Sequence, residues 1–292
     1  MRTIEILQGS ATFLVIATSF IGLCIGSFLN VVVHRLPRML DHQWSAQCRT
    51  FLDIEGPSPA PEVPGLFLPR SQCPHCGYQI KALENIPVVS FFLLGRRCSN
   101  CQAPISWRYP AIETLTAVLS VIVVLHFGLT GTALFALTLT WILIVLSFID
   151  IDHQILPDAI TLPGVWLGLA INLFGVFTDI RSAVIGAIAG YIILWSVYHI
   201  FHLVTGKEGL GYGDFKLFAL LGAWLGWQSL PTILLFSAFV GSLISISLIL
   251  GRGRDRNIPI PFGPYLAGAG WIVMLWGPNI TGAYLQFAGL NG

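Results

Sequence analysis

Charged side chains are scarce in this sequence. Lys, Arg, Asp and Glu make up 10% of the 292 residues, whereas a soluble globular domain carries roughly 25%. Hydrophobic residues make up 55%, and the mean hydropathy is +0.77. So little charge argues against a soluble domain and favours a chain that lies in a lipid bilayer. The formal net charge of +1, without a basic stripe interleaved with aromatics, also argues against a nucleic-acid-binding surface.

Long uncharged runs predict an all-α polytopic membrane protein with about eight transmembrane helices. A helix needs about 20 apolar residues to cross the hydrocarbon core. Residues 11–33 form the first span, because this run is too long for the core of a signal peptide. The run 114–149 has no formally charged side chain and is long enough for two spans, separated at Gly128 and Gly131. The other expected spans are 159–178, 182–203, two within 217–251 that separate at 226–231, and one from Phe262 onward.

The distribution of Lys and Arg supports this number of spans. If eight spans alternate, four segments lie on one side of the membrane, and they hold 13 of the 15 Lys and Arg residues. Only Arg2 and Arg181 fall on the other side. By the positive-inside rule the Lys- and Arg-rich side is the cytoplasm. The segments on that side are 34–109, 150–158, 204–216 and 251–261.

The sequence therefore divides into three parts. Residues 1–33 contain the first span, residues 34–109 form a cytoplasmic loop domain, and residues 110–292 form a transmembrane core with seven spans. Within the loop domain, residues 40–69 are rich in proline and acidic side chains, which predicts an irregular loop.

Two CxxC pairs in the loop domain predict a structural zinc site. The pairs CPHC and CSNC are separated by 21 residues, one more than the usual window for such sites. Disulfides are not expected in a cytoplasmic loop, and a redox CxxC does not need a second pair. Four thiolates fill the coordination shell of a tetrahedral Zn²⁺, so no position is left for a catalytic water. The expected ligands are Cys73, Cys76, Cys98 and Cys101.

The acidic residues of the membrane part gather in two clusters on the predicted cytoplasmic side. The stretch FIDIDHQILPD carries Asp150, Asp152, His153 and Asp158 at the end of the third span. The stretch GLGYGDFK carries Asp214 at the start of the sixth. Between Asp150 and Asp214 the chain crosses the membrane twice, so both carboxylates lie on the same side at a similar depth.

Two aspartates that share one site can act as an acid and a base. One holds a proton while the other activates water against a peptide carbonyl. Gly211 and Gly213 suit a close backbone approach or a positive φ beside Asp214. The same residue types also serve proton-coupled transporters and divalent-metal hydrolases, so the residues alone leave these three functions open.

Several motifs, taken together and in order, resemble the bacterial type IV prepilin peptidase family. GxGD alone is shared with other membrane aspartyl proteases, but the ordered set is specific and covers nearly the whole chain. The motifs are GSFLNVVVHRLP, the two CxxC pairs, ENIPVVSFFLLGRRC, RYPAIE, FIDIDHQILPD and GLGYGDFKL.

The resemblance implies a bifunctional enzyme of the bacterial inner membrane with its active site facing the cytoplasm. It implies cleavage of the basic leader from type IV prepilins or type II secretion pseudopilins, with Asp150 and Asp214 as the catalytic pair. It also implies methylation of the new amino terminus with S-adenosylmethionine, near Gly95 and Arg96 in the loop domain, and a zinc-binding cysteine tetrad.

Alternatives remain for several of these residues. Gly95 could simply end a short helix, and Arg96 could simply follow the positive-inside rule. Asp152 and Asp158 could attract the basic leader, orient the pair, or cap a helix and face water, with Pro157-Asp158 as the expected N-cap of the fourth span. His153 is expected at the interface rather than as a metal ligand. From other functional classes, a proton-coupled transporter with Asp150 and Asp214 as relay and an assembly scaffold around the zinc loop remain as hypotheses.

Overall fold

The computed structural model describes residues 11–54, 65–207, 209–252 and 260–287, and within them every named element is helical. The chain forms two compact units, residues 1–129 and 130–292. The expected division at residues 33/34 and 109/110 concerns the membrane and the cytoplasm, so it stays a prediction.

The first unit contains one long helix, one membrane-length helix and a largely irregular segment between them. Its elements are α2 (Ala11–Phe51), the short 3₁₀ helix η1 (Ala82–Asn85), α3 (Val89–Leu93) and α4 (Arg108–Phe127). Helices α2 and α4 pack closely because α2 has small residues at the contact. A Cβ atom added to Gly22 would lie 2.6 Å from the Cα of Ala117.

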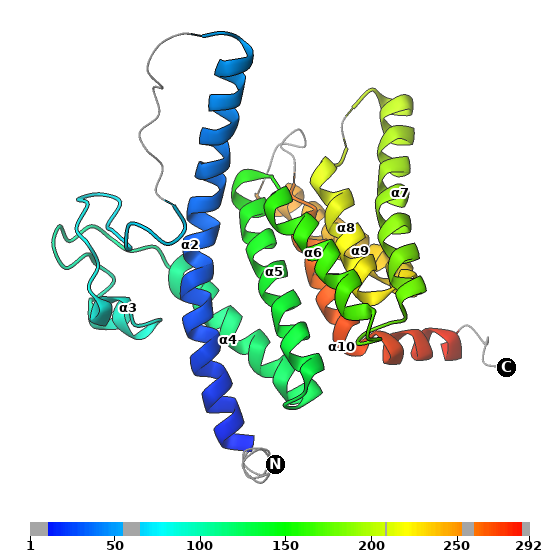
Figure 1. Cartoon of the computed structure of the whole chain (residues 1–292), viewed down its shortest axis with the longest axis horizontal. Coiled ribbons are helices and arrows are strands. Elements are labelled where there is room, and N and C mark those ends of the chain that lie inside the picture. Colours follow the sequence, from blue (N-terminus) through cyan, green and yellow to red (C-terminus); the bar gives the residue numbers. More distant parts are fainter. Residues whose placement is uncertain (1–10, 55–64, 208, 253–259, 288–292) are drawn as a thin grey trace. The chain divides into compact units, whose positions relative to one another are not determined.

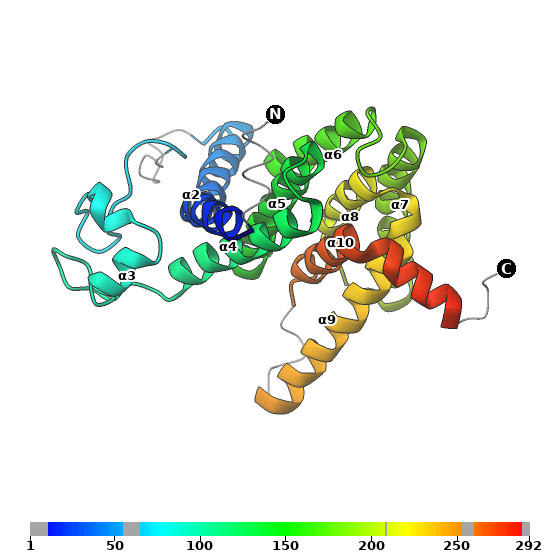
Figure 2. The same cartoon turned by 90° about the horizontal axis from the view of Figure 1, so that it is seen from below.

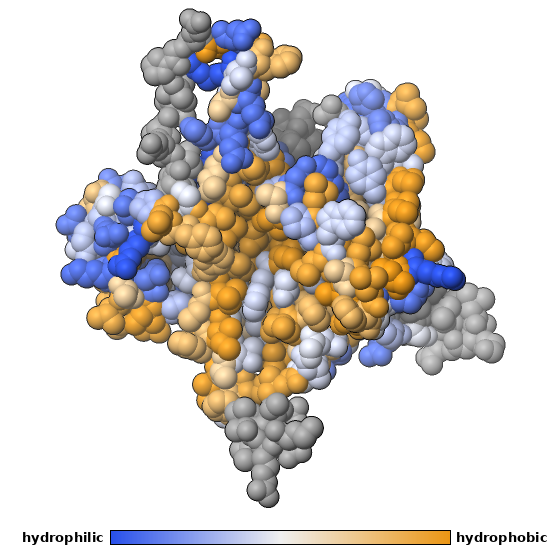
Figure 3. All heavy atoms as spheres, in the orientation of Figure 1, coloured by the Kyte–Doolittle hydropathy of each residue, from blue (hydrophilic) through white to orange (hydrophobic). Residues whose placement is uncertain are grey.

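Helix α2 is longer than the sequence predicts. The expected irregular loop at residues 40–69 is wrong for its first part, since α2 continues through Pro37 to Phe51. Residues 38–51 contain neither proline nor glycine, and extending an existing helix avoids the cost of nucleation. The rest of that expected loop includes residues 55–64, which lie outside the described residues. Figure 3 shows apolar side chains over the N-terminal part of α2 and polar ones at its C-terminal end.

The second unit is a bundle of six helices and a short 3₁₀ helix in the described part of the chain. Its elements are α5 (Gly131–His153), α6 (Asp158–Asn172), α7 (Ile180–Thr205), α8 (Tyr212–Leu225), η2 (Trp227–Ser229), α9 (Leu230–Arg252) and α10 (Gly263–Phe287). The expected breaks at Gly128–Gly131 and at residues 226–231 are confirmed, since helices end and begin there.

Helix α8 forms the centre of the second unit. It packs against α6, α7 and α10 (Figures 1 and 2). Every residue from Leu217 to Leu225 is buried. Glycines bring α7 close to it, because a Cβ added to Gly186 would lie 2.3 Å from the carbonyl oxygen of Gly222. The buried indole of Trp224 donates to the carbonyl oxygen of Gly164 on α6 at 2.8 Å. This packing fixes the N-terminus of α8, where Asp214 lies.

Five helices in the described residues are long and apolar enough to cross a membrane, and they include α2, α4, α5 and α7. The fifth runs from Trp227 to Gly251. Helices α6 and α8 have 15 and 14 residues, which at 1.5 Å per residue gives about 22 Å, short of a full bilayer core. The chain is thus all-helical in its named elements and apolar over several spans.

Candidate functional sites

Asp150 lies in the last turn of α5 with its carboxylate buried. Only 5% of the residue is exposed, and its Oδ2 accepts a hydrogen bond from the backbone N–H of Gly263 at 3.0 Å. The helix ends just beyond it, because Gln154 adopts a left-handed conformation and its N–H donates to the carbonyl oxygen of Asp150. The carboxylate is therefore held at a helix end by a residue far away in the sequence.

Asp214 lies in the first turn of α8 and is buried to the same degree. It is 6% exposed, and its Oδ2 accepts from the backbone N–H of Gly211, the N-cap residue, at 3.1 Å. A carboxylate in this position satisfies a free N–H of the helix start and interacts favourably with the helix dipole.

The structure brings the surroundings of these two aspartates together. The carboxylates interact electrostatically with each other. Leu156, in the connection between α5 and α6, packs against the glycines beside both of them. Its side chain comes within 3.3 Å of the positions that Cβ atoms would occupy at Gly213 and Gly263. Two buried carboxylates, each bound to one amide, thus meet at helix ends next to an apolar side chain.

Gly213 confirms the expected close approach. A Cβ there would lie 2.7 Å from the Cβ of Leu156, and neither Gly211 nor Gly213 has a positive φ. The reason for glycine is therefore space rather than backbone conformation.

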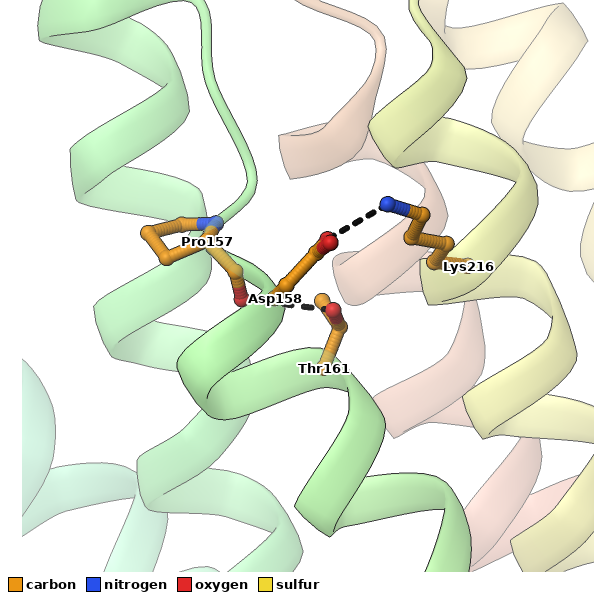
Figure 4. Close-up of polar contacts among 4 residues, drawn as sticks. All are labelled: Pro157, Asp158, Thr161 and Lys216. Carbon is orange, nitrogen blue, oxygen red and sulfur yellow. Dashed lines mark hydrogen bonds and ion pairs between the residues drawn. The ribbon is translucent and has the colours of Figure 1, made fainter. Parts of the chain in front are cut away.

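The remaining residues of the acidic cluster are arranged differently. Asp158 is the first residue of α6 rather than its N-cap, and it forms an ion pair with Lys216 of α8 (Figure 4). The N-cap is Pro157, whose carbonyl oxygen accepts from the Thr161 hydroxyl at 3.2 Å. The expected N-cap at Pro157-Asp158 is thus confirmed in position, with Pro157 as the cap residue and without a capping hydrogen bond from a side chain. Asp152 and His153 are exposed at the end of α5.

The four expected zinc ligands lie together. The sulfur atoms of Cys73, Cys76, Cys98 and Cys101 all lie within 4.8 Å of one another, and they are the one such cluster found in the described residues. Cys73 Sγ is 3.8 Å from Cys101 Sγ, and Cys76 Sγ is 4.0 Å from Cys98 Sγ. In a tetrahedral site with Zn–S bonds of about 2.3 Å the sulfurs are about 3.8 Å apart, so the arrangement fits this metal.

The two CxxC turns share one backbone pattern. The N–H of Cys73 donates to the carbonyl oxygen of Tyr78, and that of Cys98 donates to Ala103, both at 2.9 Å. Isolated β-bridges join the flanks of each turn, Gln72 with Gln79 and Arg97 with Pro104. The backbone N–H of Tyr78 lowers the pKa of the Cys76 thiol to about 7, which favours the thiolate that a metal needs. Each CxxC pair thus sits on a small hairpin that presents two sulfurs.

An open cavity of about 280 Å³ lies on the flanks of the second hairpin. The expected cofactor residues Gly95 and Arg96 line it, together with Arg97, Pro104, Ile105 and Trp107. The guanidinium of Arg96 lies over the Trp107 ring, 5.5 Å from its centroid. Gly95 follows the end of the short helix α3 with φ of +58°, so the alternative that it ends a helix is also correct.

The first hairpin has a cavity of about 330 Å³ on its own flanks. It is lined by Ser71 and Ile80 of that hairpin and by residues of α2 that include Phe28 and Arg35. Arg35 already donates to the backbone carbonyl oxygen of Gly65 at 2.7 Å. Each hairpin therefore has one open cavity on its flanks.

Three residues beside these sites did not stand out in the sequence. Gly263 binds Asp150, Leu156 packs against Gly213 and Gly263, and Trp107 lines the cavity of the second hairpin. The one available signal was the PFGPY stretch, in which Pro264 favours a helix start at Gly263. Leu156 and Trp107 carry no local pattern that separates them from packing residues.

Comparisons with known proteins match two families, and the two matches divide the chain much as its two compact units do. Residues 20–127 match the family described as Bacterial Peptidase A24 N-terminal domain, and residues 137–246 match the Type IV leader peptidase family. The first match falls in the first compact unit and the second match in the second.

Curated proteins with the same printed name are similar over nearly the whole chain. A prepilin leader peptidase/N-methyltransferase of Pseudomonas aeruginosa is 52% identical over 291 residues, covering 100% of both chains. One from Aeromonas hydrophila is 56% identical over 266 residues, covering 90% of this chain and 91% of the relative. One from Legionella pneumophila is 44% identical and covers 94% and 96%. No solved structure matches the chain.

Proposed function

Because the chain belongs to the family of prepilin leader peptidases/N-methyltransferases, we propose that it removes the basic leader from type IV prepilins or type II secretion pseudopilins and then methylates the new amino terminus. Membership makes the chain a multi-pass membrane enzyme, both a protease and a methyltransferase. The observation that carries the proposal is the pair of buried carboxylates at Asp150 and Asp214, each bound to one backbone amide.

The aspartate pair performs the cleavage. One carboxylate accepts a proton from water as the water oxygen attacks the scissile carbonyl carbon. The other, protonated, carboxyl donates its proton toward the reacting peptide, and the C–N bond then breaks with a proton on the leaving amine. Leu156, packed beside Gly213 and Gly263, limits the access of bulk water to the pair. Both carboxyls lie at helix ends, so a bond just outside a transmembrane helix reaches them without drawing that helix out of the bilayer.

The proposed topology has eight spans in the bacterial inner membrane, with the active site facing the cytoplasm. The five helices of full membrane length support the membrane placement. The remaining three spans are α6, α8 and α10. The orientation of the active site is supported by the distribution of Lys and Arg, since 13 of these 15 residues fall on the same side of the proposed membrane topology as both aspartates.

The four cysteine thiolates would hold one structural zinc ion. The sulfur separations support this. Zinc, when bound, would cross-link the two hairpins and stabilise a segment that has little regular structure.

The methylation site is proposed at the cavity lined by Gly95, Arg96 and Trp107. S-adenosylmethionine, when bound, supplies the methyl group. The Arg96 guanidinium suits its carboxylate, the Trp107 ring beneath that guanidinium helps to hold it in place, and Gly95 adds no side chain to the cavity. The role of these residues is to bind and orient the cofactor toward the neutral amine of the mature pilin.

The transporter alternative is not supported, because both matching families and the relatives named above are peptidases. The two aspartates also lie at helix ends, whereas the sites of transporters lie near the bilayer midplane.

A single experiment tests both halves of the proposal. Purified protein in liposomes is incubated with a prepilin that carries a basic leader, with and without S-adenosylmethionine, and the product is weighed by intact mass spectrometry. We expect loss of the leader in both samples and one added methyl group only with the cofactor. An unprocessed prepilin would refute the peptidase activity, and a cleaved product that stays unmethylated would refute the second activity.

The position of the cofactor can be tested separately by photo-crosslinking with labelled S-adenosylmethionine. Label on a peptide containing residues 95–107 would support the proposed cavity. Label on residues 66–85 would move the site to the cavity of the first hairpin.

A further inference from the structure

The backbone of Gly263 contacts a carboxylate from a distant part of the sequence. Gly263 is the first residue of α10, and its N–H donates to Asp150 Oδ2 at 3.0 Å. The three residues that follow Gly263 in α10 do not bind Asp150 through their backbone, because two of their N–H groups have another partner and the remaining residue has no N–H. Tyr265 and Leu266 donate to the carbonyl oxygen of Phe262, and Pro264 has no N–H. The Gly263 amide is thus satisfied by Asp150.

The absence of a side chain at Gly263 leaves room for this carboxylate. A Cβ atom there would lie 2.6 Å from Asp150 Oδ2 and 3.2 Å from its Cγ. Contacts below 3 Å with a Cβ do not occur in relaxed structures, so the carboxylate or the helix would have to move. The φ of Gly263 is not positive, so its backbone could be adopted by other residues. Glycine is required here by the position of Asp150.

The two aspartates are held in related but unequal ways. Asp214 accepts from Gly211 within its own helix start, three residues away. Asp150 accepts from the start of a different helix, 113 residues away. The position of Asp214 is therefore a local property of α8, whereas that of Asp150 depends on where α10 begins. Free N–H groups at a helix start carry partial positive charge and attract a carboxylate.

We propose that Gly263 is a positioning residue of the peptidase site: its N–H orients the Asp150 carboxylate toward Asp214, and its lack of a side chain keeps that place open. The inference rests on the proposed role of Asp150. Gly263 acts through Asp150 and does not itself react with the substrate.

The test compares two glycine-to-alanine variants of one helix. In Gly263→Ala the new methyl group displaces the carboxylate, and a displacement of about 1 Å at a reacting group can cost roughly 10²-fold in rate. We expect kcat for leader removal to fall by at least about tenfold with KM unchanged, because the substitution moves a reacting group and removes no side chain that could bind the prepilin. The matched control is Gly268→Ala, where a Cβ would meet nothing within 4 Å. It should keep both constants within about twofold.

A kcat within twofold of wild type in Gly263→Ala would overturn the inference. An equal loss in Gly268→Ala would also overturn it, since the effect would then belong to α10 as a whole. Asp150→Ala separates the inference from the proposed function. If Asp150→Ala cleaves prepilin normally, the proposed dyad is wrong. If Asp150→Ala is inactive while Gly263→Ala is normal, only the role of Gly263 is wrong.

A second measurement does not depend on the folding of Gly263→Ala. Hydrogen–deuterium exchange is followed in the peptide that spans residues 260–266, in wild type and in Asp150→Ala. Removal of the acceptor should speed exchange of the one amide bound to it, at Gly263. Unchanged exchange in that peptide would show that Asp150 does not hold this amide.

Discussion

The two candidate sites of this chain are built in opposite ways. The cysteine cluster lies on two short hairpins with little regular structure, and its ligands come in pairs with two residues between them. The aspartate pair lies at the ends of helices, and its parts come from α5, α8 and α10. Cys76 and Cys101 are exposed while Cys73 and Cys98 are buried, whereas Asp150 and Asp214 are both buried.

This difference shows where each site obtains its stability. The hairpins have few packing contacts of their own, so the metal would supply the cross-link that a core supplies elsewhere. The aspartates are placed by helix packing, and their positions follow from glycines that let backbones approach closely. Loss of a ligand should therefore damage the first site as a structure, whereas loss of a carboxylate should remove the chemistry of the second without unfolding it.

The largest effect is expected from the aspartates. Asp150→Asn and Asp214→Asn should each lower leader removal on the order of 10³-fold or more, because the two groups act as a unit. The amide side chain keeps the shape and an acceptor oxygen for the backbone N–H, so the melting temperature should change little. Cleavage is measured by the mass of the pilin product.

The matched control for this pair is Asp152→Asn, which changes an exposed carboxylate in the same helix turn. It should retain measurable cleavage. Wild-type processing by Asp214→Asn would contradict the aspartyl mechanism, whatever the result for Asp152.

The next effect concerns the metal. Cys98→Ser should lower the zinc content from about one ion per chain and expose residues 71–107 to protease, because a hydroxyl is a poor substitute for a thiolate ligand. Cys24→Ser and Cys48→Ser change free cysteines outside the cluster and should keep the metal. Elemental analysis and limited proteolysis provide the readouts. Absence of zinc in wild-type protein purified under reducing conditions would refute the site.

A smaller and more selective effect is expected at the cavity of the second hairpin. Gly95 has φ of +58°, and asparagine tolerates positive φ better than other side chains do. Gly95→Asn therefore adds a side chain beside the cavity with little backbone strain, and methylation should fall about tenfold or more while leader removal continues. A bulkier Gly95→Val would combine the same change with strain and is harder to interpret.

The control for Gly95→Asn is Gly206→Asn, at a glycine that also has positive φ and open space around it. It should leave methylation unchanged. Intact mass of the mature pilin distinguishes the cases, and a fully methylated product from Gly95→Asn would remove this residue from the site.

Much of the architecture could be predicted from the sequence because the signals are local. The breaks between α4 and α5 and between α8 and α9 follow from glycines within apolar runs. The cysteine cluster follows from two CxxC pairs, each with two residues between its cysteines. The sequence does not predict the continuation of α2 beyond residue 40, because the proline- and acid-rich composition of residues 40–69 suggests an irregular loop, whereas residues 38–51 propagate the helix.

The missed residues depend on contacts between distant parts of the chain. That Asp214 binds Gly211 can be inferred from one motif, but that Asp150 binds Gly263 depends on the packing of α10 against α5 and α8. Leu156 looks like any apolar residue until Gly213 and Gly263 are placed against it. Local patterns thus point to the proposed reacting groups, and the groups that hold them become visible only in three dimensions.

The smallest effect is expected from the ion pair between Asp158 and Lys216, which joins the starts of α6 and α8. The Asp158 side chain is 56% exposed, and exposed ion pairs contribute only about 0.2–1 kcal/mol. Lys216→Met should therefore lower the melting temperature by less than about 4 °C. Cleavage should continue at a similar rate, since the pair lies beside the aspartates without bonding to them.

Variants of this ion pair also test whether Asp158 attracts the basic leader of the prepilin. Lys216 already neutralises this carboxylate, so Asp158→Asn should leave KM for a prepilin unchanged. In the double variant Asp158→Asn/Lys216→Met, the changes in melting temperature and cleavage rate should equal the sum of the small changes in the two single variants. A rise in KM in Asp158→Asn that shrinks at high salt would mean that the leader competes with Lys216 for this carboxylate. The comparison of the two sites would then change, because an exposed residue would contribute to a site that is otherwise made of buried helix ends.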